Sequence, residues 1–160
     1  MLLYIMSLSN VPDYLTLHKS DAIDNSDVYS WNVPQSYYTS ARGNVCFVSL
    51  VSASVDDAED SSLVVKYHGG QNANNTKNDG NVLGVCYLST SATNPNYMYD
   101  SAENIKLLIQ ARPSTISLSL VGYDNAVKGI TNGIFTLKFD YLNEDEVARD
   151  YSNTLYNKLN

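Results

Sequence analysis

The residues most able to do chemistry in this chain are its two histidines, His18 and His68. A metalloenzyme of the two-histidine, one-carboxylate kind needs both imidazoles and a carboxylate on facing strands. The usual His-x-Asp or His-x-His pair is absent, and Asp21 follows His18 by three positions, which places it on the opposite face of a strand. We therefore interpret both histidines as solvated or hydrogen-bonded side chains and predict no metal site.

Other catalytic motifs are also missing from the sequence. No G-x-S-x-G nucleophile elbow occurs, and the glycines at 69–70 precede neither a helix nor the Lys-Ser/Thr pair of a phosphate loop. The acidic run at 56–60 offers oxygen ligands that suit calcium, but it lacks the EF-hand spacing and is better interpreted as a solvated loop. The sequence therefore predicts no catalytic residue, no cofactor and no enzyme.

Cysteine and tryptophan are the next candidates for a site. Cys46 and Cys86 lie in the apolar runs VCFVSLV and VLGVCYL, so we expect two buried thiols, with a disulfide as the alternative. Neither has a second cysteine at metal-ligand spacing. Trp31 is interpreted as a core residue, although together with Tyr97 and Tyr99 it could stack on sugar rings.

Charge and hydropathy exclude several kinds of partner. The chain of 160 residues has a net charge of −7 and no cluster of Lys or Arg, whereas a nucleic-acid-binding domain normally carries a basic patch. We expect no direct contact with nucleic acid. The apolar start, MLLYIMSLSNV, is too short to cross a bilayer and lacks the basic region of a signal peptide, which predicts no membrane span and synthesis inside the cell.

The elements that would position any site are strands. Period-2 alternation and Gly, Pro, Asn and Asp between the runs predict an all-β fold, an antiparallel sandwich of eight strands. The expected strands are residues 14–18, 28–33, 45–55, 63–68, 82–89, 105–111, 115–121 and 134–142. Residues 45–55 are apolar on both faces, which suggests a strand covered on two sides. The predicted core is Ile105, Leu107, Ile109, Ile116, Leu118, Leu120, Phe135, Leu137 and Phe139, with Thr115, Ser117 and Ser119 pointing the other way.

The two ends differ from this single predicted domain, residues 13–142. Residues 1–12 form an apolar arm, and residues 143–160 form a tail with a weak helical stripe. A helix this short needs a surface to lie on. We expect both ends to dock on neighbouring subunits through Leu2, Leu3, Tyr4, Ile5, Val147, Tyr151 and Leu155. The polar loop at 69–81 has nothing to bury and is expected at the surface.

The last three strands carry a resemblance to a known family. An Asn-Ile pair at 104–105 opens a strand that ends at Arg112, and a serine-rich alternating strand, the turn GYDN at 122–125 and the run GIFTLKF at 133–139 follow. This order resembles single jelly-roll capsid proteins of icosahedral double-stranded DNA viruses: pentons and minor capsid proteins of virophages, Polinton-like viruses and giant viruses. The resemblance covers about residues 13–142 and lies in the pattern of apolar residues and in the number of strands.

The resemblance implies an eight-stranded jelly roll with no catalytic residues. It implies a structural subunit of the virion, assembled in the host cell as a pentamer or trimer and in contact with the major capsid protein. One alternative is a carbohydrate- or receptor-binding sandwich of the lectin or fibre-head type, which would expose aromatic residues on loops. The other is a double-stranded β-helix enzyme, which would require a metal.

Overall fold

The computed structural model describes residues 12–25, 28–38, 45–56, 62–69, 81–88, 96–98 and 105–142. These residues are all-β, with eleven strands, two 3-10 turns and no α-helix among them. The strands are β1 (Asp13–His18), β2 (Ile23–Asn25), β3 (Val28–Asn32), β4 (Val45–Asp56), β5 (Ser62–His68), β6 (Asn81–Leu88), β7 (Asn96–Met98), β8 (Leu107–Gln110), β9 (Thr115–Val121), β10 (Val127–Lys128) and β11 (Gly133–Leu142). The turns are η1 (Lys19–Asp21) and η2 (Gln35–Tyr37).

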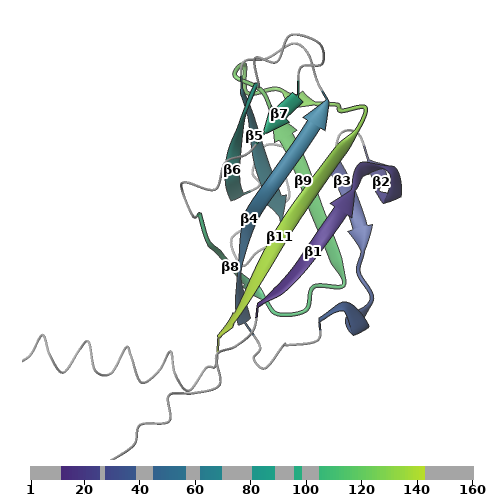
Figure 1. The fold of residues 1–160 in the computed structure, drawn as a ribbon, viewed down its shortest axis with the longest axis vertical. Coiled ribbons are helices and arrows are strands. Elements are labelled where there is room, and N and C mark those ends of the chain that lie inside the picture. The colour runs from purple at the N-terminus through teal and green to yellow at the C-terminus, as the bar shows by residue number, and fades with distance from the viewer. Residues whose placement is uncertain are drawn as a thin grey trace, which may run out of the picture.

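The strands form two antiparallel sheets that face each other (Figure 1). The first sheet has the order β1-β11-β4-β8, and the second has the order β6-β5-β9-β3-β2, with β10 beside β9. The short strand β7 pairs with β4 of the first sheet and with β6 of the second. It therefore joins the two sheets along one side of the molecule.

Eight of the eleven strands correspond to the eight ranges expected from the sequence, so the all-β class is confirmed. The predicted count of eight is not, because β2, β7 and β10 are additional strands of two or three residues. Such short segments carry too few side chains for a period-2 pattern to stand out. Their pairing partners, rather than their own sequence, make them strands.

The core lies between the sheets and is formed by the alternating side chains predicted from the sequence. Seven of the nine predicted core residues are buried: Ile109, Ile116, Leu118, Leu120, Phe135, Leu137 and Phe139. Ile105 and Leu107 are only partly buried, because β8 pairs with β4 alone among the described strands and its start is less covered. Edge-to-face contacts of Trp31 with Phe135 (centroids 6.1 Å apart) and of Tyr38 with Phe139 (5.6 Å) add aromatic packing.

A β-bulge at Val51 explains the apolar run of β4. Thr136 pairs with Ser52 and Leu137 with Leu50, so Val51 has no opposite residue in β11. Before the bulge the even-numbered Cys46, Val48 and Leu50 are buried, and after it the odd-numbered Ala53 and Val55 are. One extra residue reverses the alternation and keeps both halves of the strand facing the core. The two-sided apolar pattern thus comes from this change of phase.

The predicted turn at 122–125 is present and ends β9. Asn125 has φ 60°, a left-handed conformation that asparagine tolerates, and the Gly122 N–H donates to the Ala126 carbonyl at 2.9 Å. The Asp124 carboxylate accepts from the Ala126 N–H at 3.0 Å and pairs with Lys128. The chain then returns along β9 as β10 before it enters β11.

Truncation of the Phe139 ring tests this packing. Phe139 has no exposed surface and contacts the ring of Tyr38, so Phe139→Ala should lower the free energy of unfolding by about 3–5 kcal/mol. Ile134→Ala is the matched control, because Ile134 lies on the same strand and is 44% exposed. Urea unfolding measures both. A cost below about 1 kcal/mol for Phe139→Ala would show that the strand faces are assigned the wrong way round.

Candidate functional site

From the sequence we interpret both histidines as solvated or hydrogen-bonded side chains, and the structure places them on different sheets. His18 ends β1 in the first sheet and is exposed, whereas His68 ends β5 in the second sheet and is half-buried. Among the described residues, no group of three or more His, Cys, Asp or Glu side chains could hold a metal ion. Asp56, the first residue of the acidic run, accepts a hydrogen bond from the Asn132 amide at 3.1 Å, and residues 57–60 lie outside the described part.

His68 forms a hydrogen bond that the sequence did not reveal. Its Nε2 lies 2.7 Å from Oγ of Ser119, and on the same sheet Ser30 and Ser117 share a hydroxyl–hydroxyl bond of 2.8 Å. Burial of the imidazole, and to a smaller extent the charge of Lys66, lowers the pKa of His68 below its ordinary value. Serine and histidine can form a nucleophile–base pair, but Ser119 has no exposed surface and cannot reach a substrate. The pair is therefore a structural contact between β5 and β9.

Ser119 is buried, although the alternation of β9 places it on the face opposite Leu118 and Leu120. Ser119 lies in the middle of the second sheet, opposite Val28 of β3 and Lys66 of β5. The hydroxyl keeps a partner in His68, which offsets the cost of burying it.

Both cysteines are buried and free, as the preferred interpretation of the sequence predicts, and they form no disulfide. Burial raises the pKa of each thiol to about 12, with a smaller contribution from Asp140 at Cys46. A thiol of this kind is inert, because the thiolate is the reactive form. Trp31 is also a core residue, only 4% exposed, and its indole N–H donates to the His18 carbonyl at 2.8 Å. It therefore presents no ring for a sugar to stack on.

The remaining predicted candidates fall outside what the structure describes. The backbone of Tyr97 belongs to β7, but neither its side chain nor any part of Tyr99 is described. The loop at 70–80 is also outside the described residues. So are the expected subunit contacts Leu2, Leu3, Tyr4, Ile5, Val147, Tyr151 and Leu155.

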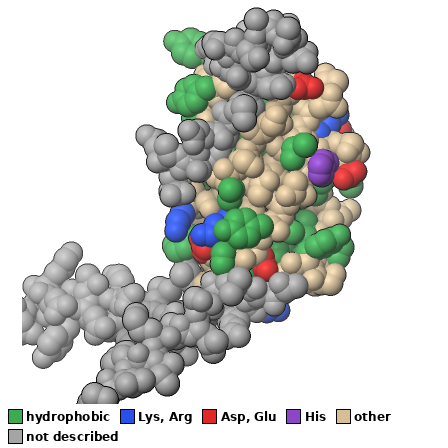
Figure 2. All heavy atoms as spheres, viewed as in Figure 1, with side chains coloured by type: hydrophobic (Ala, Val, Ile, Leu, Met, Phe, Trp, Pro, Cys, Tyr) green, Lys and Arg blue, Asp and Glu red, His purple; other side chains and the backbone are tan. Residues whose placement is uncertain are grey.

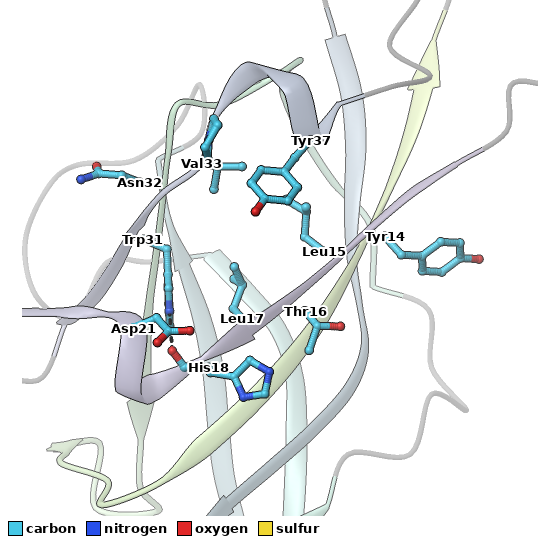
Figure 3. A pocket seen from close by; sticks show the side chains of 11 residues that line it. Tyr14, Leu15, Thr16, Leu17, His18, Asp21, Trp31, Asn32, Val33 and Tyr37 are labelled. Carbon is cyan, nitrogen blue, oxygen red and sulfur yellow. Dashed lines mark hydrogen bonds between the residues drawn. The ribbon is translucent and has the colours of Figure 1, made fainter.

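One groove is the candidate binding surface, and the sequence did not predict it. It has a volume of about 430 Å³ and lies between β1 of the first sheet and the β3–η2 segment of the second. Leu15, Leu17, Trp31 and Val33 form its apolar interior, and the ring of Tyr37 projects over Leu15 at the rim (Figure 3). Tyr37 is 60% exposed. The alternation of β1 and the turn at Pro34 were visible in the sequence, but not that they lie side by side.

Comparisons with known proteins identify no relative: no family model matches the chain, and neither a curated protein nor a solved structure is significantly similar to it. None of the described helical segments is long and apolar enough to span a membrane. The function must therefore be argued from the fold and its surfaces.

The lowered pKa of His68 predicts a pH dependence of stability. The folded state favours the neutral imidazole, so its contribution is complete above the ordinary pKa of 6.5 and is lost as the pH falls below that value. Urea unfolding at pH 7.5 and pH 5 should show a smaller loss of stability for His68→Gln than for the unmodified chain. His18→Gln, at an exposed histidine, is the matched control for the loss of an imidazole. An equal loss in all three proteins would contradict the assignment.

The raised pKa values of the cysteines predict slow thiol chemistry. At pH 8 about one thiol in ten thousand is ionised at a pKa near 12, and both sulfurs are shielded from solvent. Ellman's reagent should detect no free thiol in the native protein over minutes and two thiols in denaturant. Rapid stoichiometric reaction of either cysteine in the native state would show that its strand opens to solvent.

Proposed function

We propose that this chain is a jelly-roll structural subunit of a viral capsid, a penton or minor capsid protein that assembles with copies of itself and with a major capsid protein in the virion. The observation that carries the proposal is the order of strand pairing. Four antiparallel pairs are nested in the sequence: β1 with β11, β3 with β9, β4 with β8, and β5 with β6.

A jelly roll is such a nested antiparallel ribbon rolled into two sheets. Rolling brings the last strand of the outer pair beside the first strand of the third pair, which corresponds to the pairing of β11 with β4. It also brings β9 beside β5. This agreement supports a jelly roll over a sandwich of sequential hairpins, in which neighbouring strands in the chain would pair throughout. The hydrophobic rhythm of residues 105–142, which resembles the capsid proteins, falls on β8, β9 and β11.

The surface supports a protein that is covered by neighbours. Figure 2 shows hydrophobic side chains at several separate places on the face formed by β1, β11 and β4. Protein interfaces are enriched in tyrosine and depleted in charge, and only 17% of this chain is charged. Large apolar or aromatic side chains are exposed on both sheets, on η2 and in the 122–126 turn: Tyr14, Ile23, Tyr37, Val82, Tyr87, Leu108, Tyr123 and Ile134.

The lectin-type alternative loses one of its three aromatic candidates, because Trp31 is buried. The topology alone would still accommodate it, since jelly rolls also occur in lectins. What favours a capsid subunit is the combination of apolar terminal segments with exposed aromatic residues on several faces. A single sugar site would require only one such face.

Native mass spectrometry of the full chain tests the proposal, and the expected result is a closed pentamer or trimer. Leu155→Asp, in the tail that we expect to dock on a neighbour, should raise the concentration at which the oligomer dissociates at least tenfold, because burial of a leucine on docking would contribute about 1.5–3 kcal/mol. Asn157→Asp is the matched control of equal charge. A chain that stays monomeric at micromolar concentration would contradict the proposed function.

A further inference from the structure

One edge of β1 has no partner strand among the described residues. The other edge pairs with β11 in unbroken register from Asp13 to His18. His18 is extended (φ −100°, ψ 134°), and its carbonyl accepts the indole N–H of Trp31 from the second sheet, so its backbone groups point away from β11. Along an antiparallel strand, residues alternate in the edge to which they direct N–H and C=O. Tyr14 and Thr16 therefore direct theirs to the same free edge as His18.

No described residue bonds the backbone groups of Tyr14 and Thr16 on this edge. The apolar groove runs directly beside it, with Leu15 and Leu17 of β1 in its wall and Tyr37 opposite (Figure 3). A row of unpaired backbone donors and acceptors next to an apolar groove is what an extended apolar segment needs in order to add to a sheet.

The opposite side of the sandwich illustrates what such a segment would do. There the three-residue strand β7 pairs with both β4 and β6 and bridges the two sheets. On the groove side, β1 and β2 are the two ends of the hydrogen-bonded strand order. Within the described residues, only the hydrogen bond between Trp31 and His18 spans this side near the groove.

We propose that residues 2–8 of a second copy of this chain add to the free edge of β1 as an antiparallel or parallel strand and bury their apolar side chains in the groove. This inference rests on the proposed self-assembly. The segment, LLYIMSL, is uncharged, has six apolar or aromatic residues out of seven, and includes Tyr4 and Ile5, which suit strands. It precedes β1 in the sequence, and the four intervening residues can extend over at most about 14 Å, so it can reach only a neighbouring copy that lies close to the start of β1.

Residues 2–8 of the same chain fit the free edge of β1 less well than residues 2–8 of a second copy. To lie beside its own β1, the chain would need a tight reversal within residues 9–12, Ser-Asn-Val-Pro. The favoured two-residue hairpin turns require positive φ at one or both central residues. Val11 is β-branched and Pro12 has φ fixed near −65°, so both oppose such a turn. Donation to a neighbouring copy avoids it.

Disulfide trapping in the full chain tests the inference. Thr16→Cys, exposed on β1, is co-assembled with a differently tagged partner that carries one of five single substitutions: Leu2→Cys, Leu3→Cys, Tyr4→Cys, Ile5→Cys or Met6→Cys. Directly opposite residues of adjacent strands have Cβ atoms about 4.5–5.5 Å apart, near the range for a disulfide. Cross-links between copies should therefore form at every second position of residues 2–6. Their yield should be several-fold higher than at the positions between them, because alternate side chains of a strand share a face.

Leu108→Cys is the matched control, since Leu108 is 45% exposed on β8 at the far edge of the same sheet. Cross-linking there should remain at background. Equal cross-linking at positions 16 and 108 would overturn the inference. So would cross-linking only within one chain, in a variant that carries both the arm cysteine and Thr16→Cys. An oligomer in the native mass spectrum without a link at position 16 would overturn it and leave the proposed function standing. A monomer would overturn both.

Discussion

The pairing of β4 with β11 is the interaction on which the rest of this structure depends. It is the longest ladder in the described part of the chain, with ten residue pairs whose members are 78 to 97 positions apart in the sequence. Every other strand of the first sheet is attached to one of these two, β1 to β11 and β8 to β4. The bulge at Val51 lets the ladder change phase without turning its apolar side chains to solvent. Without that extra residue, one half of β4 would present Ser52 and Ser54 to the core.

Buried tyrosines connect this core to the loops around it. The Tyr29 hydroxyl accepts the Ile130 N–H at 2.9 Å, Tyr38 donates to the Pro113 carbonyl at 2.7 Å, and Tyr141 donates to Asp13 at 3.0 Å. In each case the ring contributes apolar burial while the hydroxyl satisfies a polar group, which is a loop backbone group for Tyr29 and Tyr38 and the first residue of β1 for Tyr141. Burial raises the pKa of Tyr38 and Tyr141, so both stay protonated and able to donate. The high tyrosine content therefore has a structural use in the interior as well as on the surface.

The most reactive side chains among the described residues, apart from the exposed His18, are buried or half-buried. In the histidine–serine pair that most resembles catalytic machinery, Ser119 is fully buried and His68 is half-buried, and the two thiols are buried in the core. By contrast, the groove beside β1 combines an apolar wall with backbone groups that no described residue bonds. A sheet edge left open next to a hydrophobic surface is a liability unless something covers it. An assembly that completes each subunit with a segment of the next would remove this liability.

Period-2 alternation is a local property, and it was enough to predict the all-β class, eight strand ranges and most of the core between Ile109 and Phe139. The burial of Trp31 and both cysteines was predicted from their residue types and from the strand-like runs in which they lie. Pairing is not local. The bulge at Val51, the strands β2, β7 and β10, the burial of Ser119 and the groove under Tyr37 all depend on which distant segments lie next to one another. A strand's sequence shows which of its faces is apolar, but its edges carry the same N–H and C=O groups whatever the residue. Which edge finds a partner, and which stays open, was therefore decided only when the sheets assembled.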